Sequence, residues 1–271
     1  MAACPDLCKL AAAHSQGTSI SMKKIGILGG VGWASTLDYY RAICEGAGAF
    51  FAARGAGSPL PVPPITIESV VQAQTRSLRG RPGDEASWAA FDAVFREAML
   101  TLERAGCDFA LIASNTPHAR LHAIRDGVMM PILSIFDATA EATAQTGATR
   151  ALVLGTTVTM QDRNYANVLA AHGVSANDPL PQAEIAEMQA MIDEDFYGGA
   201  SATAQARLLR FSAKHVKPGD AILLACTELP LAFPDHLDDV SFKAGGFLFV
   251  NPSAAHAAAA LDLALEDERP G

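Results

Sequence analysis

The sequence has few cysteines, no long apolar run and no block of basic residues, and each absence excludes a class of protein. The five cysteines are scattered and lack a C-x-x-C pair, so we expect neither a disulfide scaffold nor a zinc site. We therefore expect a reducing, cytoplasmic location. No stretch approaches the roughly 18 consecutive apolar residues of a membrane span. The 20 Lys and Arg form no basic block, and the net charge is −9, which argues against a nucleic-acid partner.

Two common cofactor-binding patterns are also missing. Gly30 and Gly32 would need a third glycine or an alanine at position 35 to complete a dinucleotide loop, and Ser35 stands there. None of the lysines follows a buried strand, where a Schiff-base lysine is often found. We therefore expect neither a nucleotide cofactor nor pyridoxal phosphate.

The first 21 residues do not have the pattern of a targeting segment. They carry acidic Asp6 as well as Lys9 and are interrupted by Pro5, so they lack the basic start and apolar centre of a secretory signal. We interpret residues 1–21 as a disordered arm without a functional role, and Met22 as an alternative start of the chain.

Short apolar strands alternate with helices along the rest of the sequence. Strands are expected at residues 25–28, 65–67, 109–113, 131–135, 151–154, 221–225 and 247–250. Helices are expected after a capping box at Ser35 and Asp38, and at residues 84–105, 138–145, 164–171, 182–216 with a break at 198–199, and 253–265. This alternation predicts an α/β fold with mostly parallel sheets and ligand sites beyond the carboxyl ends of strands.

Two strand ends are near copies of one another. One apolar strand leads into Ser114-Asn115-Thr116, and another leads into Cys226-Thr227-Glu228, at a spacing of 226 − 114 = 112 residues. This spacing is too long for a solenoid repeat and suits the duplication of half a protein. The sequence therefore predicts two similar lobes with a cleft between them.

The same two strand ends carry the side chains best suited to chemistry. Backbone N–H groups after the strand are expected to lower the pKa of the Cys226 thiol, although an inert buried cysteine is the alternative interpretation. Ser114, Asn115 and Thr116 could cradle a carboxylate, or merely cap a helix. Two groups that face each other are what a proton needs to leave one face of a carbon and return on the other.

Four ordered segments resemble the aspartate/glutamate racemase family. They are the glycine loop through Gly30 with Trp33, Ser35-Thr36 and Tyr39-Tyr40, then Ser114-Asn-Thr-Pro-His118, Leu154-Gly-Thr156 with Thr159-Met160, and Ala225-Cys-Thr-Glu228. The resemblance extends from about Met22 to Leu265. It implies two similar α/β lobes, each a mostly parallel sheet flanked by helices, with the active site in the inter-lobe cleft. The implied boundaries are residues 22–135 plus 247–271 for lobe 1 and 136–246 for lobe 2.

The resemblance also implies roles for particular residues. Two cysteines of the family exchange a proton at the substrate's α-carbon without a cofactor; here Cys226 is one of them, and Ser114 replaces the other. Asn115, Thr116 and Thr227 are implied to hold the α-carboxylate, Gly30 and Thr156 to line the cleft, and Glu228 to assist the amine or to orient Cys226. An alcohol is a far weaker acid than a thiol, so lower or lopsided activity is expected.

Other polar residues are assigned more weakly. Members strict for aspartate bind its distal carboxylate with cationic side chains, and this chain has Ala186 or Glu187 where a lysine is expected. The candidates to replace that lysine are Arg76, Arg79 and Arg81. His118 is interpreted as a core or capping histidine, and His256 as a cleft residue or a satisfied buried one.

Three functions remain open at this point. The first is an isomerase that racemises aspartate, glutamate or a related amino acid without a cofactor. The second is a single-cysteine decarboxylase or isomerase of the same superfamily, and the third is a catalytically silent amino-acid-binding protein. The expected partner is a small-molecule amino acid, and a homodimer is implied only by the resemblance.

Overall fold

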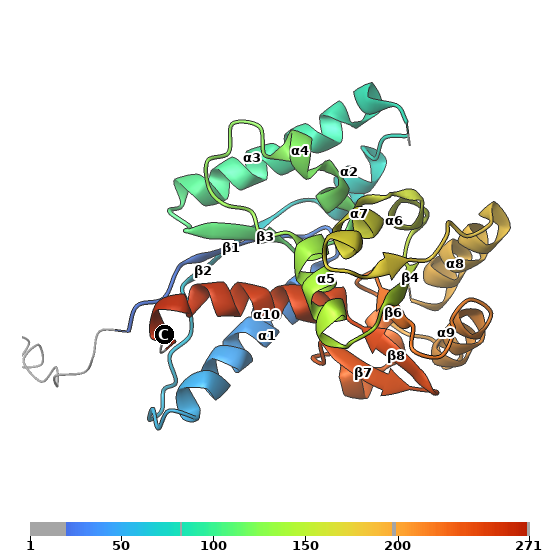
Figure 1. The fold of residues 1–271 in the computed structure, drawn as a ribbon. Helices are drawn as coiled ribbons and strands as arrows, with labels where there is room; N and C mark the ends of the chain where they lie inside the picture. The colour runs from blue at the N-terminus through green and yellow to red at the C-terminus, as the bar shows by residue number, and fades with distance from the viewer. Residues whose placement is uncertain (1–19, 82, 197–198, 270–271) are drawn as a thin grey trace, which may run out of the picture.

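The computed structural model describes residues 20–81, 83–196 and 199–269, which form an α/β protein with two sheets (Figure 1). The three-stranded sheet has the parallel order β2-β1-β3, made of β1 (Ile25–Gly29), β2 (Ile65–Ser69) and β3 (Phe109–Ile112). The five-stranded sheet has the order β5-β4-β6-β8-β7. Its strands are β4 (Arg150–Leu154), β5 (Ser175–Ala176), β6 (Ala221–Leu224), β7 (Ser241–Ala244) and β8 (Phe247–Val250), and only β7 and β8 pair antiparallel. The predicted fold class is confirmed.

The helices follow the strands in the expected alternation and cover the sheets. The longer ones are α1 (Trp33–Ala52), α3 (Ala89–Arg104), α5 (Ile135–Gln145), α7 (Asn164–Ala171), α8 (Gln182–Asp195), α9 (Ala204–Ala213) and α10 (Pro252–Ala264). The short ones are α2 (Gln72–Ser77), α4 (Leu121–Ile124), α6 (Thr157–Gln161), and the 3-10 helices η1 (Glu85–Trp88), η2 (Thr116–Arg120), η3 (Leu229–Ala232), η4 (Pro234–His236) and η5 (Glu266–Glu268). In the described part of the chain, no helix is both long and apolar enough to cross a membrane.

The innermost strands are buried on both faces. Every residue of β1, β3 and β6 is buried, which is why these strands appear in the sequence as continuous apolar runs and not as an alternation. Separate apolar clusters form around them, so each sheet has its own core. This burial fixes the direction of each strand and therefore the place where its carboxyl end opens.

The last strand and the last helix join the two halves of the chain. Figure 1 shows α10 beside α1, and α10 also packs against α5. The strand expected at residues 247–250 pairs with β6 in the five-stranded sheet. Its assignment to lobe 1 is therefore wrong, because its hydrogen bonds are made with the central strand of the other sheet. The division into two lobes remains a prediction.

Three local predictions differ from the structure. The strand expected at residues 131–135 is reduced to a single bridge between Ala110 and Ile132, because helix α5 already begins at Ile135. The capping box at Ser35 is wrong, since α1 starts at Trp33 and has no side-chain cap. The expected disordered arm, apart from residues 20 and 21, lies outside the described residues.

Candidate active site

A cavity of about 460 Å³ lies at the carboxyl ends of β3, from the three-stranded sheet, and β6, from the five-stranded sheet. Its size lies within the range of small-molecule sites, roughly 300 to 1,000 Å³. Seven of the eight residues predicted for the site line it: Ser114, Asn115, Thr116, Thr156, Cys226, Thr227 and Glu228. The structure therefore brings together two strand ends that lie 226 − 114 = 112 residues apart in the sequence.

Cys226 lies two residues beyond the end of β6, in the turn before η3. Its thiol donates a hydrogen bond to the Glu228 carboxylate, with 3.0 Å between Sγ and Oε2, and the Thr227 hydroxyl donates to the same oxygen at 3.0 Å. The side chain is 7% exposed. Cys226 is therefore a shielded thiol with a carboxylate directly beside it.

The pKa of Cys226 differs from the prediction. Burial raises the pKa of the thiol well above its usual range, and the negative charge of Glu228 adds to the effect. The Glu228 backbone N–H and the Arg79 guanidinium oppose the shift without overcoming it. The expected lowering of the pKa is thus wrong, because desolvation of a thiolate outweighs a backbone donor. At rest Cys226 is a protonated thiol.

Ser114 occupies the corresponding end of β3. Its backbone carbonyl accepts a hydrogen bond from Nδ1 of His118 over 2.7 Å, and the hydroxyl of Ser35 donates to the preceding Ala113 carbonyl over 2.9 Å. Within the described residues, the Ser114 hydroxyl itself has no hydrogen-bond partner. The backbone of this strand end is therefore held from two sides while the hydroxyl stays available to the cavity.

Asn115 has one amide atom engaged and one unengaged. Its Oδ1 accepts a hydrogen bond from the Tyr165 hydroxyl at 2.5 Å. Its Nδ2 is buried and has no partner among the described residues. A buried donor without an acceptor destabilises the protein, and a carboxylate oxygen of a ligand could accept its hydrogen bond and remove this cost.

Gly30 is the one predicted site residue that does not line the cavity. It has a φ of +82°, and a Cβ there would lie 2.2 Å from the Val70 carbonyl oxygen. Its N–H donates to Thr36. Its lining role is therefore wrong: glycine is required here for the turn after β1, and the neighbouring Val31 and Gly32 reach the cavity instead.

Thr156 lines the cavity from the loop after β4 and also caps the short helix α6, where its Oγ1 accepts from the Thr159 N–H. The loop approaches the cysteine loop closely, since a Cβ on Gly155 would lie 2.6 Å from the Ala225 carbonyl oxygen. Glycine at position 155 therefore lets these two strand ends lie side by side.

Two of the three arginines proposed for a distal carboxylate line the cavity, namely Arg76 and Arg79. Arg79 is half-buried and, within the described ranges, its guanidinium forms no hydrogen bond or ion pair. Burial, followed by the charge of Arg76, lowers the pKa of the Arg79 guanidinium, while nearby negative groups oppose this. Arg81 instead pairs with Asp84 over 2.6 Å.

The wall formed by α8 was not predicted. Neither Ala186 nor Glu187 lines the cavity, but three later residues of α8 and its C-cap residue do, namely Gln189, Ile192, Asp193 and Phe196. Their spacing of three and four residues marks one face of the helix. That spacing was visible in the sequence, but nothing indicated which face would meet the cleft. Trp33, Ser35 and Thr159 are further lining residues that were not assigned to the site.

His118 and His256 are both buried, as expected of core histidines. Nε2 of His256 lies 3.1 Å from the Leu133 carbonyl oxygen, and its Nδ1 lies 3.0 Å from the Tyr39 hydroxyl. Burial lowers the pKa of His118 to about 4 and that of His256 well below its usual range. Both rings are therefore neutral near pH 7, and neither lines the cavity.

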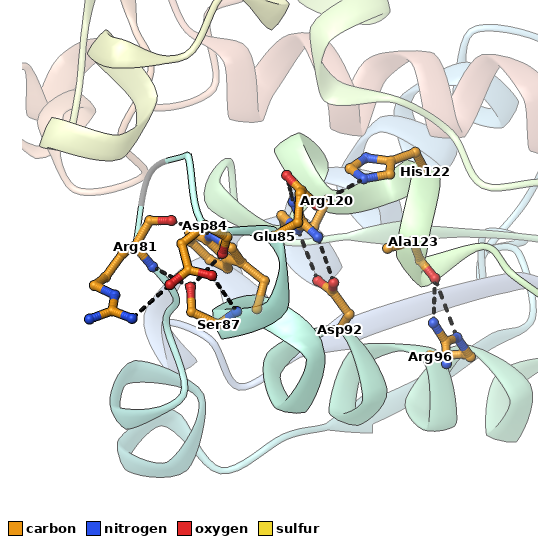
Figure 2. A network of polar contacts seen from close by, with 10 residues as sticks. Arg81, Asp84, Glu85, Ser87, Asp92, Arg96, Arg120, His122 and Ala123 are labelled. Carbon is orange, nitrogen blue, oxygen red and sulfur yellow. Dashed lines mark hydrogen bonds and ion pairs between the residues drawn. The ribbon is translucent and has the colours of Figure 1, made fainter.

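An ion-pair network around the buried Arg120 and Asp92 anchors the segment that follows the cavity arginines (Figure 2). Arg120, on η2 directly after the Ser114 strand end, forms two hydrogen bonds with Asp92 of α3, at 3.1 and 2.8 Å, and one with Glu85 of η1 at 3.0 Å. Arg96 adds hydrogen bonds to the Ala123 carbonyl. The network joins two segments that both lead to the cavity.

The model of the Asp/Glu/hydantoin racemase family matches residues 28–260. The broad specificity amino-acid racemase RacX of Bacillus subtilis (strain 168) is 29% identical over 217 residues, which cover 79% of this chain and 88% of RacX.

Two solved structures share the fold over most of the chain. An aspartate racemase homologue from Pyrococcus horikoshii OT3 is 26% identical with a TM-score of 0.66, covering 90% of this chain and 99% of the other. A candidate Asp/Glu racemase from Yersinia pestis is 26% identical with a TM-score of 0.71, covering 90% of this chain and 100% of the other.

Proposed function

The chain belongs to the Asp/Glu/hydantoin racemase family, and from that premise we propose that it racemises an amino acid by removing and returning the α-proton without a cofactor. Racemases are isomerases. The observation that carries the proposal is the presence of Ser114 and Cys226, from the ends of β3 and β6, in one cavity. Proton transfer on opposite faces of a carbon needs two such groups.

Glu228 supplies the base that the Cys226 thiol needs. The thiol is protonated at rest and donates to the Glu228 carboxylate over 3.0 Å. Passing this proton to Glu228 gives a thiolate and a neutral carboxylic acid, so no charge is created in the buried site. The thiolate then takes the α-proton, the electron pair moves into the substrate's carboxylate, and the thiol is restored.

Ser114 is proposed to deliver a proton to the opposite face of the carbanion. A serine hydroxyl does not ionise near pH 7, so it is a poor base toward an α-hydrogen. It can still donate a proton to a carbanion, directly or through a water molecule that it holds. The alkoxide or hydroxide left behind then recovers through solvent the proton that Glu228 took from Cys226, which restores both groups. The enantiomer whose α-hydrogen faces Cys226 therefore exchanges this hydrogen more readily than it inverts. Because two enantiomers have the same free energy, kcat/KM is equal in the two directions, and the asymmetry appears as different kcat and KM values for the two enantiomers. Lopsided kinetic constants are the expected consequence.

The substrate's α-carboxylate is proposed to bind at Asn115, Thr116 and Thr227. The unpartnered Nδ2 of Asn115 supports this placement, because it is a buried donor without an acceptor on a residue that lines the cavity. Thr156 completes the wall beside Cys226. The carbanion formed by proton loss delocalises into this carboxylate, so donors aimed at its oxygens stabilise the charge as it develops.

Arg79 is the residue proposed to recognise an acidic side chain. It lines the cavity without an ion-pair partner among the described residues. A distal carboxylate would supply a direct ion-pair partner with bidentate geometry. This supports aspartate, glutamate or a related acidic amino acid as the substrate.

A second candidate function is favoured by Ser114 itself. With a single thiol in the cavity, a decarboxylase or isomerase that protonates a carbanion from the Cys226 side would not need a base on the other face. Release of carbon dioxide from a substituted malonate, without racemisation of any amino acid, would establish this alternative.

The test is to incubate the purified protein with L-aspartate, L-glutamate and a panel of other L-amino acids in deuterium oxide. The Cα–H signals are followed by NMR and the chirality by chromatography. Loss of the Cα–H signal with formation of the D-enantiomer is the expected result. Tight amino-acid binding without any exchange would instead indicate a catalytically silent binding protein and contradict the proposal.

A further inference from the structure

We propose that Tyr165 is a positioning residue that orients the Asn115 amide so that its N–H groups, and not its oxygen, face the substrate's carboxylate. This inference rests on the proposed function, because it assumes that a carboxylate binds at Asn115. It concerns a residue of α7 that does not line the main cavity. Tyr165 therefore acts through Asn115 and does not touch the substrate.

Tyr165 is held rigidly in the core beside the five-stranded sheet. It is 2% exposed and belongs to the apolar cluster around α5 and α7. Its ring meets that of Phe136 edge to face, with 4.6 Å between the centroids. A ring packed in this way has little freedom to move its hydroxyl.

The hydroxyl of Tyr165 acts as a donor. Burial raises the pKa of this phenol far above its usual range, so it keeps its proton at any pH at which the protein functions. It donates to Oδ1 of Asn115 over 2.5 Å. A short hydrogen bond from a fixed donor selects the amide oxygen as its neighbour.

The orientation of an amide decides the sign of the partial charge that it presents. With Oδ1 turned toward Tyr165, Nδ2 lies on the other side, buried and without a partner in the described part of the chain. The opposite orientation would place an oxygen toward a carboxylate, where two acceptors repel each other. Tyr165 thus removes an unfavourable binding state before the substrate arrives, which is preorganisation.

The hydrogen bond also connects elements of the two sheets. Asn115 follows β3 of the three-stranded sheet, whereas Tyr165 lies on α7, which packs against α5 and contacts β5 of the five-stranded sheet. The orientation of the carboxylate-binding amide therefore depends on the core of the other half of the protein.

The test is a double-mutant cycle of Tyr165→Phe and Asn115→Ala, with kcat/KM measured for the substrate that the wild-type protein exchanges fastest. Tyr165→Phe alone is expected to lower kcat/KM by about fivefold to tenfold, the effect of one hydrogen bond. In the Asn115→Ala background the same change is expected to have less than about a twofold effect, because there is no amide left to orient. Equal reductions in both backgrounds, or no reduction in either, would overturn the inference.

Tyr39→Phe is the matched control, because Tyr39 is also a buried tyrosine, its hydroxyl lies 3.0 Å from Nδ1 of His256, and it does not line the main cavity. Its kcat/KM should be reduced less than that of Tyr165→Phe at a similar loss of stability in urea. Should the wild-type protein exchange no amino acid, the proposed function fails separately. The same cycle is then measured as amino-acid dissociation constants by calorimetry, where the same non-additivity supports the role of Tyr165 and additivity overturns it.

Discussion

The thiol of Cys226 donates a hydrogen bond to the carboxylate of Glu228, and 3.0 Å separates Sγ from Oε2. Both groups belong to one turn, two residues apart. Burial and, after it, the carboxylate raise the pKa of the thiol, and the carboxylate is also the base beside the thiol that can remove its proton. The pair therefore stores the proton on sulfur at rest and can move it when the substrate binds.

Replacing Glu228 with glutamine should change the reactivity of the thiol and the catalytic rate in opposite directions. Without the negative charge the pKa of Cys226 falls, so alkylation by iodoacetamide near pH 8 should become faster. The base is lost at the same time, so Cα–H exchange should fall by about 100-fold or more. Glu97→Gln, on the surface of α3, is the control and should change neither rate. A glutamine variant with unchanged exchange would contradict the role of Glu228.

Ser114 determines how a proton reaches the second face of the carbanion. Ser114→Cys places a second thiol in the cavity and should increase racemisation by about tenfold or more, because a thiol is a far stronger acid than an alcohol. Ser114→Ala should keep exchange at the Cys226 face while inversion declines. Chiral chromatography and NMR of the same samples separate the two quantities. Equal losses of exchange and inversion in Ser114→Ala would show that Ser114 has no separate role.

The pair between Arg120 and Asp92 should make a large contribution to stability. Both side chains are almost fully buried, at 8% and 5% exposure, so Asp92→Asn leaves a buried guanidinium with only the largely exposed Glu85 as its counter-charge. The expected loss is about 3 to 5 kcal/mol in the free energy of unfolding by urea. The exposed pair of Arg104 and Glu97 is the control, and Glu97→Gln should cost no more than about 1 kcal/mol. Similar losses in both variants would contradict this account.

Stability should fall in mild acid because His118 is buried in its neutral form. Its pKa is lowered from 6.5 to about 4, so between these values the unfolded chain binds more protons than the folded one, and stability rises with pH. The full difference is about 3 kcal/mol at about 1.4 kcal/mol per pKa unit.

His118→Asn should reduce the difference in unfolding free energy between about pH 4.5 and about pH 7, measured by urea titration. Part of the difference remains in this variant, because burial also lowers the pKa of His256. A variant with the same pH dependence as the wild-type protein would show that His118 does not titrate as the structure indicates.

The sequence predicted the fold class and the meeting of Ser114 with Cys226 because both follow from local patterns. Buried parallel strands are continuous apolar runs, and polar residues directly after them must lie at the carboxyl edge of a sheet. Such rules do not give the partner of a strand. The place of β8 beside β6 depends on pairing between distant segments, and the sequence assigned it to the wrong half.

The pKa of Cys226 and the lining role of Gly30 needed the structure for other reasons. A sequence shows that backbone donors follow the cysteine, but not that its thiol is buried against Glu228. It shows a glycine in a loop, but not that a Cβ at this position would collide with the Val70 carbonyl oxygen. The α8 wall and the Tyr165 contact come from segments that no motif connects to the strand ends. The cytoplasmic location and a homodimer remain predictions.

The most direct test of the account is Cα–H exchange in deuterium oxide by the wild-type protein and its Cys226→Ala variant, with Cys44→Ala as a cysteine control outside the cavity. The account predicts that exchange is lost in Cys226→Ala and kept in Cys44→Ala, with both variants folded by circular dichroism. Exchange that persists in Cys226→Ala would contradict it, because no other thiol lines the cavity among the described residues.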